Sequence, residues 1–383
     1  MAEPMQYVSG TAMALSELPE RIQPYLAPTS PVATRLRAAA GTLPLPPDQL
    51  ITVLLFLSQD SDELVQKKAT AALLEMPADL TQPVLAHLTS PAGLDAAVRV
   101  FRRNDEIAIE LGSNPKTADD TVRWLAGTAS ANVCDAIGRN HVRALRTPAI
   151  VEALWLNPKA SQGVVQGLLE LAVRQNLPLE HIAGFREVKA ILSGEEKDAE
   201  HEKGLSDIEF SRAMAWATQS YEREYGSTTQ PLPGDNHKTE DDKTSTLQTL
   251  ISKMSVSQKV RLAMVGDANV RKLLIRDPKK LVALAVLRSP RISEGEVTNF
   301  AGNKSLSEEL LTVICRNRNW VKDYATRKAL VFNPKTPITF AMTFLRQLSP
   351  KDLKDASGSR DVNQTVARTA KRMIADKADK HKS

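Results

Sequence analysis

Two Arg-Asn pairs stand where predicted helices end, and their residue types could bind an extended peptide. An asparagine amide offers both a donor and an acceptor to a peptide backbone. An adjacent arginine can pair with a carboxylate, and a tryptophan can supply a stacking surface. The structural alternative is that each asparagine satisfies backbone groups at the end of its own helix. The candidate partner-binding residues are Arg139, Asn140, Arg316, Asn317, Asn319 and Trp320.

A second candidate is a concentration of positive charge between Thr246 and Arg291, with ten Lys/Arg against two acidic residues. Lys279 and Lys280 follow Pro278 at a predicted helix N-terminus, where backbone N–H groups and ammonium charge would converge on an anion. Such contacts give salt-sensitive binding to nucleic acid, although no recognition motif accompanies them. Solvation of helix faces is the alternative. The candidate anion-binding residues are Arg271, Lys272, Arg276, Lys279, Lys280, Arg288 and Arg291.

No motif predicts catalysis, a cofactor or a metal. The chain lacks GxxxxGK[ST], GxGxxG, HExxH and GxSxG, and its six histidines are scattered. The two cysteines, Cys134 and Cys315, form no CxxC or close Cys/His cluster, so we expect buried, reduced thiols. We therefore expect a non-enzymatic protein without catalytic residues, cofactor or metal ligands.

Composition favours an all-α fold. Hydrophobic residues make up 42% of the 383 residues but aromatic residues only 4%, which indicates helices packed through small and unbranched side chains. No stretch approaches the roughly 20 apolar residues of a transmembrane helix. The N-terminus also lacks the basic and apolar regions of a signal peptide. We expect no membrane insertion and a cytoplasmic location.

The helical regions carry a repeated motif. "ALWLNPK" ends at Lys159 and "ALVFNPK" ends at Lys335. Related turns give spacings of 43 residues from Asn114 to Asn157 and 44 residues from Ser289 to Asn333. These spacings fall within the roughly 40–47-residue period of two- or three-helix repeats. We interpret Asn-Pro as a boundary at which the asparagine caps the following helix and the proline begins it.

Other residues predict where helices begin. A hydroxyl followed three residues later by an acid is a capping box, and Pro directly after a hydroxyl residue is typical of the first helical position. The predicted capping boxes begin at Thr117, Ser206, Ser293 and Ser305, and the predicted Pro starts are Thr336-Pro337 and Ser349-Pro350.

The stretch "LSQDSDELVQKKATAALLEMP", Leu57 to Pro77, resembles a HEAT repeat in its Asp-containing turn, Val65, and Ala and Leu at helical spacing. The longer NPK modules resemble uncharacterised bacterial HEAT-like proteins over most of residues 48–375. This resemblance implies a HEAT/armadillo-like α-solenoid. Armadillo-type peptide binders, which these repeats loosely resemble, use asparagines of an inner helix to hold a peptide. HEAT-like alkylpurine DNA glycosylases make enzymatic activity a remote alternative, but no motif supports it.

Five segments follow from composition. Residues 1–47 form an Ala/Pro-rich arm, 48–192 an N-terminal repeat block, 246–375 a C-terminal repeat block and 376–383 a basic tail. Residues 193–245 form an acidic, partly disordered linker with 13 acidic and 6 basic residues and one predicted helix that opens at Ser206.

Together these features predict two solenoid blocks that form a scaffold, with a concave groove for a protein or peptide partner. The alternative is binding of nucleic acid or another polyanion through residues 246–291. The acidic linker could also fold onto that basic block. The sequence leaves the partner and the oligomeric state open.

Overall fold

The computed structural model describes residues 12–177, 179, 182–192, 204–225 and 240–380. In this part of the chain all regular elements are helices, with no strand, so the predicted all-α class is confirmed. The contacts divide the chain into two compact units, Pro4–Leu179 and Glu180–Ser383, which we call the first and the second unit.

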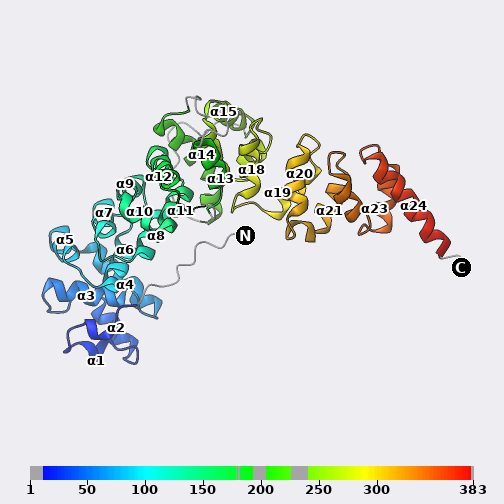
Figure 1. Cartoon of the computed structure of the whole chain (residues 1–383). Helices are drawn as coiled ribbons and strands as arrows, with labels where there is room; N and C mark the ends of the chain where they lie inside the picture. Colours follow the sequence, from blue (N-terminus) through cyan, green and yellow to red (C-terminus); the bar gives the residue numbers. More distant parts are fainter. Residues whose placement is uncertain (1–11, 178, 180–181, 193–203, 226–239, 381–383) are drawn as a thin grey trace. The chain divides into compact units, whose positions relative to one another are not determined.

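The first unit contains a 3₁₀ helix and twelve α-helices among its described residues (Figure 1). They are η1 (Leu15–Glu17), α1 (Gln23–Leu26), α2 (Val32–Ala38), α3 (Pro47–Leu57), α4 (Glu63–Glu75), α5 (Ala78–Ala86), α6 (Pro91–Phe101), α7 (Asp105–Ser113), α8 (Asp119–Thr128), α9 (Ala131–Arg139), α10 (His141–Arg146), α11 (Pro148–Leu156) and α12 (Gln162–Arg174).

The described residues of the second unit contain twelve α-helices and one 3₁₀ helix. They are α13 (Phe185–Leu192), α14 (Asp207–Tyr225), α15 (Glu240–Lys253), α16 (Val256–Val265), α17 (Ala268–Leu274), α18 (Lys280–Arg288), α19 (Glu294–Gly302), α20 (Glu308–Arg316), η2 (Trp320–Lys322), α21 (Tyr324–Val331), α22 (Ile338–Leu345), α23 (Pro350–Gly358) and α24 (Gln364–Lys380).

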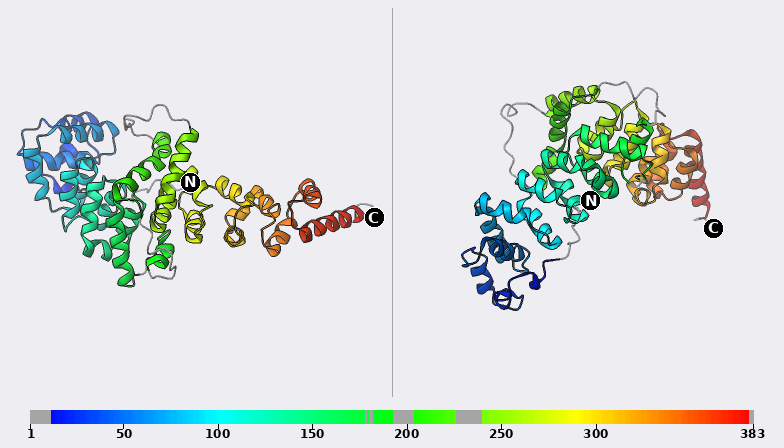
Figure 2. Two further views of the ribbon diagram at one scale, coloured as in Figure 1. Left: turned by 90° about the horizontal axis from the view of Figure 1, so that it is seen from above. Right: turned by 60° about the vertical axis from the view of Figure 1, so that its left-hand side comes forward.

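Within each unit, most of the short helices pack against a helix next to them in the sequence and against the second or third helix along the chain. In the first unit α5, α7, α9 and α12 contact one another in succession, and so do α4, α6, α8 and α11. In the second unit α16 contacts α18, α18 contacts α20, and α19 contacts α21. Figure 2 shows this succession of short helices from two further directions. The core lies between neighbouring helices and consists mostly of Leu, Val and Ala, which allow close helix approach.

The Asn-Pro motif closes a turn between helices. Asn157 is the C-cap of α11 and is 2% exposed. Its amide nitrogen donates to the carbonyls of Ala126 (2.8 Å) and Ala129 (3.2 Å), and its Oδ1 accepts from the N–H of Lys159 (2.9 Å). The N–H of Ala160 then bonds back to the carbonyl of Asn157. This tetrapeptide is therefore a β-turn with proline at its second position.

The same hydrogen bonds recur at two other Asn-Pro turns. Asn333 donates to the carbonyls of Ala301 (2.8 Å) and Asn303 (3.1 Å) and accepts from Lys335 N–H (3.1 Å). Asn114 donates to Leu88 O (3.2 Å) and accepts from the N–H of the residue after its proline (2.9 Å). The prediction that Asn caps the following helix is wrong. The asparagine instead ends the preceding helix. Its side-chain nitrogen donates to carbonyls at or just after the end of an earlier helix.

Half of the predicted helix starts are confirmed. The capping boxes at Ser206 and Ser293 are present, and α23 begins with Pro350 after a Ser349 cap. Three other starts are wrong by one or two residues. The N-caps are Ala118 for α8, Ser307 for α20 and Pro337 for α22, instead of Thr117, Ser305 and Thr336. The hydroxyl of Thr117 instead donates to the carbonyl of Leu111 (2.6 Å), where it closes the preceding turn.

The helix predicted within the acidic linker packs into the second unit. Phe210, Ala213 and Met214 of α14 are buried, and α14 contacts α16. The side chain of Gln258 bonds both the N–H (2.9 Å) and the carbonyl (2.7 Å) of Leu205 just before that helix. The predicted disorder at 193–203 and 226–239 lies outside the described residues.

α13, which the sequence placed at the end of the N-terminal block, contacts α16 and α18 in the second unit. The contact-based boundary therefore falls at Leu179, before the boundary at residue 192 that composition suggested.

Candidate functional site

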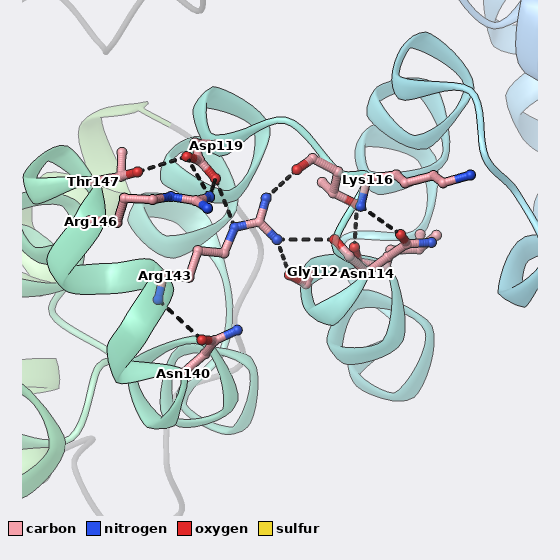
Figure 3. Close-up of polar contacts among 10 residues, drawn as sticks. Gly112, Asn114, Lys116, Asp119, Asn140, Arg143, Arg146 and Thr147 are labelled. Carbon is pink, nitrogen blue, oxygen red and sulfur yellow. Dashed lines mark hydrogen bonds and ion pairs between the residues drawn. The ribbon is translucent and has the colours of Figure 1, made fainter.

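The first Arg-Asn pair lies at the corner between α9 and α10. Arg139 is the last residue of α9, and both Arg139 and Asn140 are exposed. Asn140 ends α9 and caps α10, since its Oδ1 accepts from the N–H of Arg143 at 3.2 Å (Figure 3). The oxygen of Asn140 therefore has the structural role that was the alternative to peptide binding, whereas the arginine side chain projects from the helix end.

The buried Arg143 attaches this corner to the connection between α7 and α8. Its Nη1 donates to the carbonyls of Gly112 (3.3 Å) and Asn114 (3.0 Å), and its Nη2 donates to that of Thr117. Its Nε donates to Asp119 at 2.8 Å. A side chain from α10 thus bonds one carbonyl of the last turn of α7 and two carbonyls of the connection between α7 and α8 (Figure 3).

Asp119 is the acidic centre of this network. It also accepts from Arg146 (3.0 Å) and from the Thr147 hydroxyl (2.7 Å). Partial burial alone would raise the pKa of Asp119, but the hydrogen bonds from Thr147, Arg143 and Arg146 outweigh it and lower that pKa. A cavity of about 10 Å³ beside Asn140 and Arg143 has room for one water molecule at most. A partner would therefore contact the exposed side chains of this corner.

The second Arg-Asn pair lies at the corner between α20 and α21, which contains η2. Arg316 is the last residue of α20 and is exposed, and Asn317 is half-buried. The Oδ1 of Asn317 accepts from the N–H of Asn319 at 3.0 Å. Trp320 begins η2 and is half-buried, and Asn319 beside it is exposed.

The two corners thus share two features. In each, an exposed arginine ends a helix and the following asparagine uses its oxygen for a local backbone N–H. Asn140 lies in the first unit, whereas Arg316 and Asn317 lie in the second. That all three residues face one surface stays a prediction.

Internal partners compensate much of the charge in the basic segment 246–291. Arg271 is 4% exposed and forms two bonds to Glu296 (2.8 and 3.0 Å) and one to Gly266 O (2.7 Å). Lys280 pairs with Glu309 at 2.6 Å, and Arg288 pairs with the buried Glu187. Those three acids lie outside the segment, which is why its charge count overstated the free charge.

The remaining candidates of this segment differ in exposure. Arg291 donates to Val265 O at 2.6 Å. Lys272 and Arg276 are exposed and Lys279 is half-buried. The predicted helix N-terminus at Lys279 and Lys280 is confirmed as the start of α18.

Sequence reasoning missed two cations at the second corner, Arg318 and Lys322, which are exposed on either side of Trp320. The signal was present in the sequence. From Leu310 to Lys351 there are eight Lys/Arg and one acidic residue, Asp323. This segment is therefore nearly as basic as residues 246–291.

No group of three or more His, Cys, Asp or Glu side chains is close enough to hold a metal in the part of the chain that the structure describes. Cys134 and Cys315 are buried, as expected, and neither forms a disulfide with a described residue; burial raises the pKa of the Cys315 thiol to about 12. No helix in the described part of the chain combines the length and the apolar character that crossing a membrane requires.

Comparisons of the chain with protein-family models, with curated proteins and with solved structures returned no match.

Proposed function

We propose that the chain is a helical-repeat protein of the α-solenoid type, and that it serves as a non-enzymatic scaffold for a protein or peptide partner in the cytoplasm. The observation that carries this proposal is a recurring order of elements. Between Asn114 and Asn157 the order is α8, α9, short α10 and α11. Between Ser289 and Asn333 it is α19, α20, short η2 and α21.

The bonds at the ends of these stretches support the repeat interpretation. Asn157 reaches back to carbonyls at the end of α8, and Asn333 reaches back to carbonyls at the end of α19. Ser289 uses its hydroxyl in the same way on Met264 O (3.3 Å) in α16. Each turn thus joins its helix to an earlier helix pair. Stacks built in this way bury one continuous core and leave a long surface for a partner.

The corners support the binding part of the proposal. Arg139 and Arg316 are exposed at equivalent helix ends, and each is followed by an asparagine. The Oδ1 atoms of these asparagines bond the backbone, whereas their amide nitrogens and the two arginines bond no described residue, which leaves them for a peptide.

Site-specific photo-crosslinking in the native cells tests this proposal. The photoreactive residue p-benzoylphenylalanine would replace Asn140 or Asn317, and exposed Lys68 and Lys272 would be the control positions. We expect both corner positions to give the same discrete protein adduct and the controls to give none. Absence of adducts at the corners, or equal adducts at the control positions, would overturn the scaffold function.

A further inference from the structure

Five exposed cations of the second unit form no ion pair with the residues that the structure describes, and three of them, Arg316, Arg318 and Lys322, lie within four residues of Trp320 in the sequence. Lys328, in contrast, pairs with Asp352 at 2.7 Å. We call this set, together with Trp320, the basic edge. Its cations are Arg316, Arg318, Lys322, Arg346 and Lys351.

Hydrogen bonds between neighbouring helices bring these residues to one edge of the unit. The N-terminal parts of α19 and α21 meet where the hydroxyls of Thr298 and Thr326 lie 2.7 Å apart. The N-terminal ends of α21 and α23 meet where the N–H of Ser349 donates to the Tyr324 hydroxyl at 2.9 Å. The corner before α21 therefore adjoins the connection before α23, which carries Arg346, and Lys351 follows in the first turn of α23.

Two carboxylates at this edge, those of Asp323 and Asp352, are already engaged. Asp323 accepts from the N–H of Thr326 at 2.8 Å, and Asp352 accepts from Lys328, Tyr324 and Ser349. The hydrogen bond from Lys328, followed by those from Tyr324 and Ser349, lowers the pKa of Asp352 to about 2. These acids hold helices together and are not paired with the five cations, so the edge keeps a positive field.

The corner that carries the tryptophan is held in place. Nη1 of Arg327 donates to the carbonyls of Val321 (2.9 Å) and Lys322 (3.0 Å), and its guanidinium lies 5.8 Å from the Tyr324 ring centroid. η2 therefore has a fixed attachment to α21. The half-buried Trp320 starts η2, and its indole N–H has no bond to a described residue.

We infer that the basic edge binds single-stranded nucleic acid, a function beyond the proposed protein scaffold. Arginine guanidinium groups pair with phosphate oxygens, and an indole between cations offers a face on which a base can stack. An acidic peptide would satisfy the cations but brings no group that needs a stacking platform. The combination of unpaired cations and a fixed, partly exposed indole therefore favours a polynucleotide.

Fluorescence anisotropy of the full chain with fluorescein-labelled (dT)20 in 50 mM and 200 mM KCl tests this inference. We expect R316Q/R318Q/K322Q to weaken binding at least tenfold at the lower salt. Its log K against log [salt] slope should be shallower by about 2, because each phosphate contact on a single strand contributes about 0.7. Trp320→Leu should weaken binding at least fivefold and leave the slope unchanged.

The matched control is R360Q/R368Q/K371Q, which removes the same charge from exposed positions of this unit that form no ion pair with a described residue and lie outside the candidate anion-binding residues. It should stay within twofold of the unaltered chain, and circular dichroism should show all variants to be folded. An equal loss in the control would mean non-specific attraction and would overturn the site.

Two further results would also overturn it. One is absence of (dT)20 binding at 50 mM KCl. The other is equally tight binding of a fluorescein-labelled 20-residue polyglutamate, which would assign the edge to acidic proteins. Because the crosslinking at Asn140 detects protein adducts in the first unit, failure of nucleic-acid binding is distinguishable from failure of the scaffold function.

Discussion

A single side chain, the asparagine of the Asn-Pro turn, links three parts of the fold. In Asn333 the amide nitrogen serves two carbonyls near the end of α19, and the oxygen holds the turn that leads to α22. The residue is only 2% exposed, so water cannot replace these bonds. A buried acceptor without a partner costs more than the net gain of an ordinary hydrogen bond, which makes this side chain important for stability.

We expect Asn333→Ala to lower the free energy of unfolding by about 1–3 kcal/mol, because the carbonyl of Ala301 loses its donor and the carbonyl of Asn303 keeps only the N–H of Leu306. The control is Asn317→Ala, where a half-buried oxygen bonds one N–H and the loss should be about 1 kcal/mol or less. Urea denaturation followed by circular dichroism measures both. Equal losses in the two variants would contradict the role assigned to Asn333.

The helix starts show which residue roles the sequence could predict. The Ser206 and Ser293 caps were predictable because the hydroxyl and its partners lie within three residues of one another. Thr117 was not, because its hydroxyl bonds Leu111 O in the turn before it. The role of Asn157 was also missed, because the carbonyls that it serves come from α8 and the loop after it, far back in the sequence.

Helices of the two units are short, so contacts between neighbours must hold them in place. Isolated helices of about ten residues are marginal in water, and packing supplies most of their stability. Side-chain hydrogen bonds between residues about 25 positions apart in the sequence join a helix to the next helix but one. Examples are Thr121 to Asp95 (2.7 Å) and Arg271 to Glu296 (2.8 Å). The sequence indicated the longer period of 43–44 residues, but it could not show these pairs because neither partner stands in a repeated motif.

Close helix approach depends on one glycine at the contact of α9 with α12. A Cβ on Gly138 would lie 2.2 Å from Cγ1 of Val164, so Gly138→Ala should lower the free energy of unfolding by about 1–3 kcal/mol. Gly167 within α12 has open space, and Gly167→Ala should raise it by about 0.5–1 kcal/mol. Thermal and urea denaturation measure both changes. A neutral Gly138→Ala would show that the two helices can move apart without cost.

At the scale of the whole molecule, composition predicted the all-helical class that the described residues show, but it did not locate the division between the units at Leu179. α13 follows the last helix of the first unit without a change in composition, so sequence reasoning assigned it to the N-terminal block. The contacts of α13 with α16 and α18 place it in the second unit. Glu187 of α13 is 2% exposed and pairs with Arg288 of α18, and Phe185 and Val188 are buried in the second unit. Partners about 100 residues apart leave no local signal.

This boundary makes a prediction for fragments of the chain. A fragment of residues 182–383 keeps α13, whereas a fragment of residues 193–383 lacks it and exposes the surface of α16 that α13 covers. Burying a large apolar side chain contributes about 1.5–3 kcal/mol. We therefore expect the shorter fragment to be less stable by about 3 kcal/mol or more in urea denaturation. The comparison separates the two boundaries, because equal stability of the two fragments would place the end of the first unit at residue 192 after all.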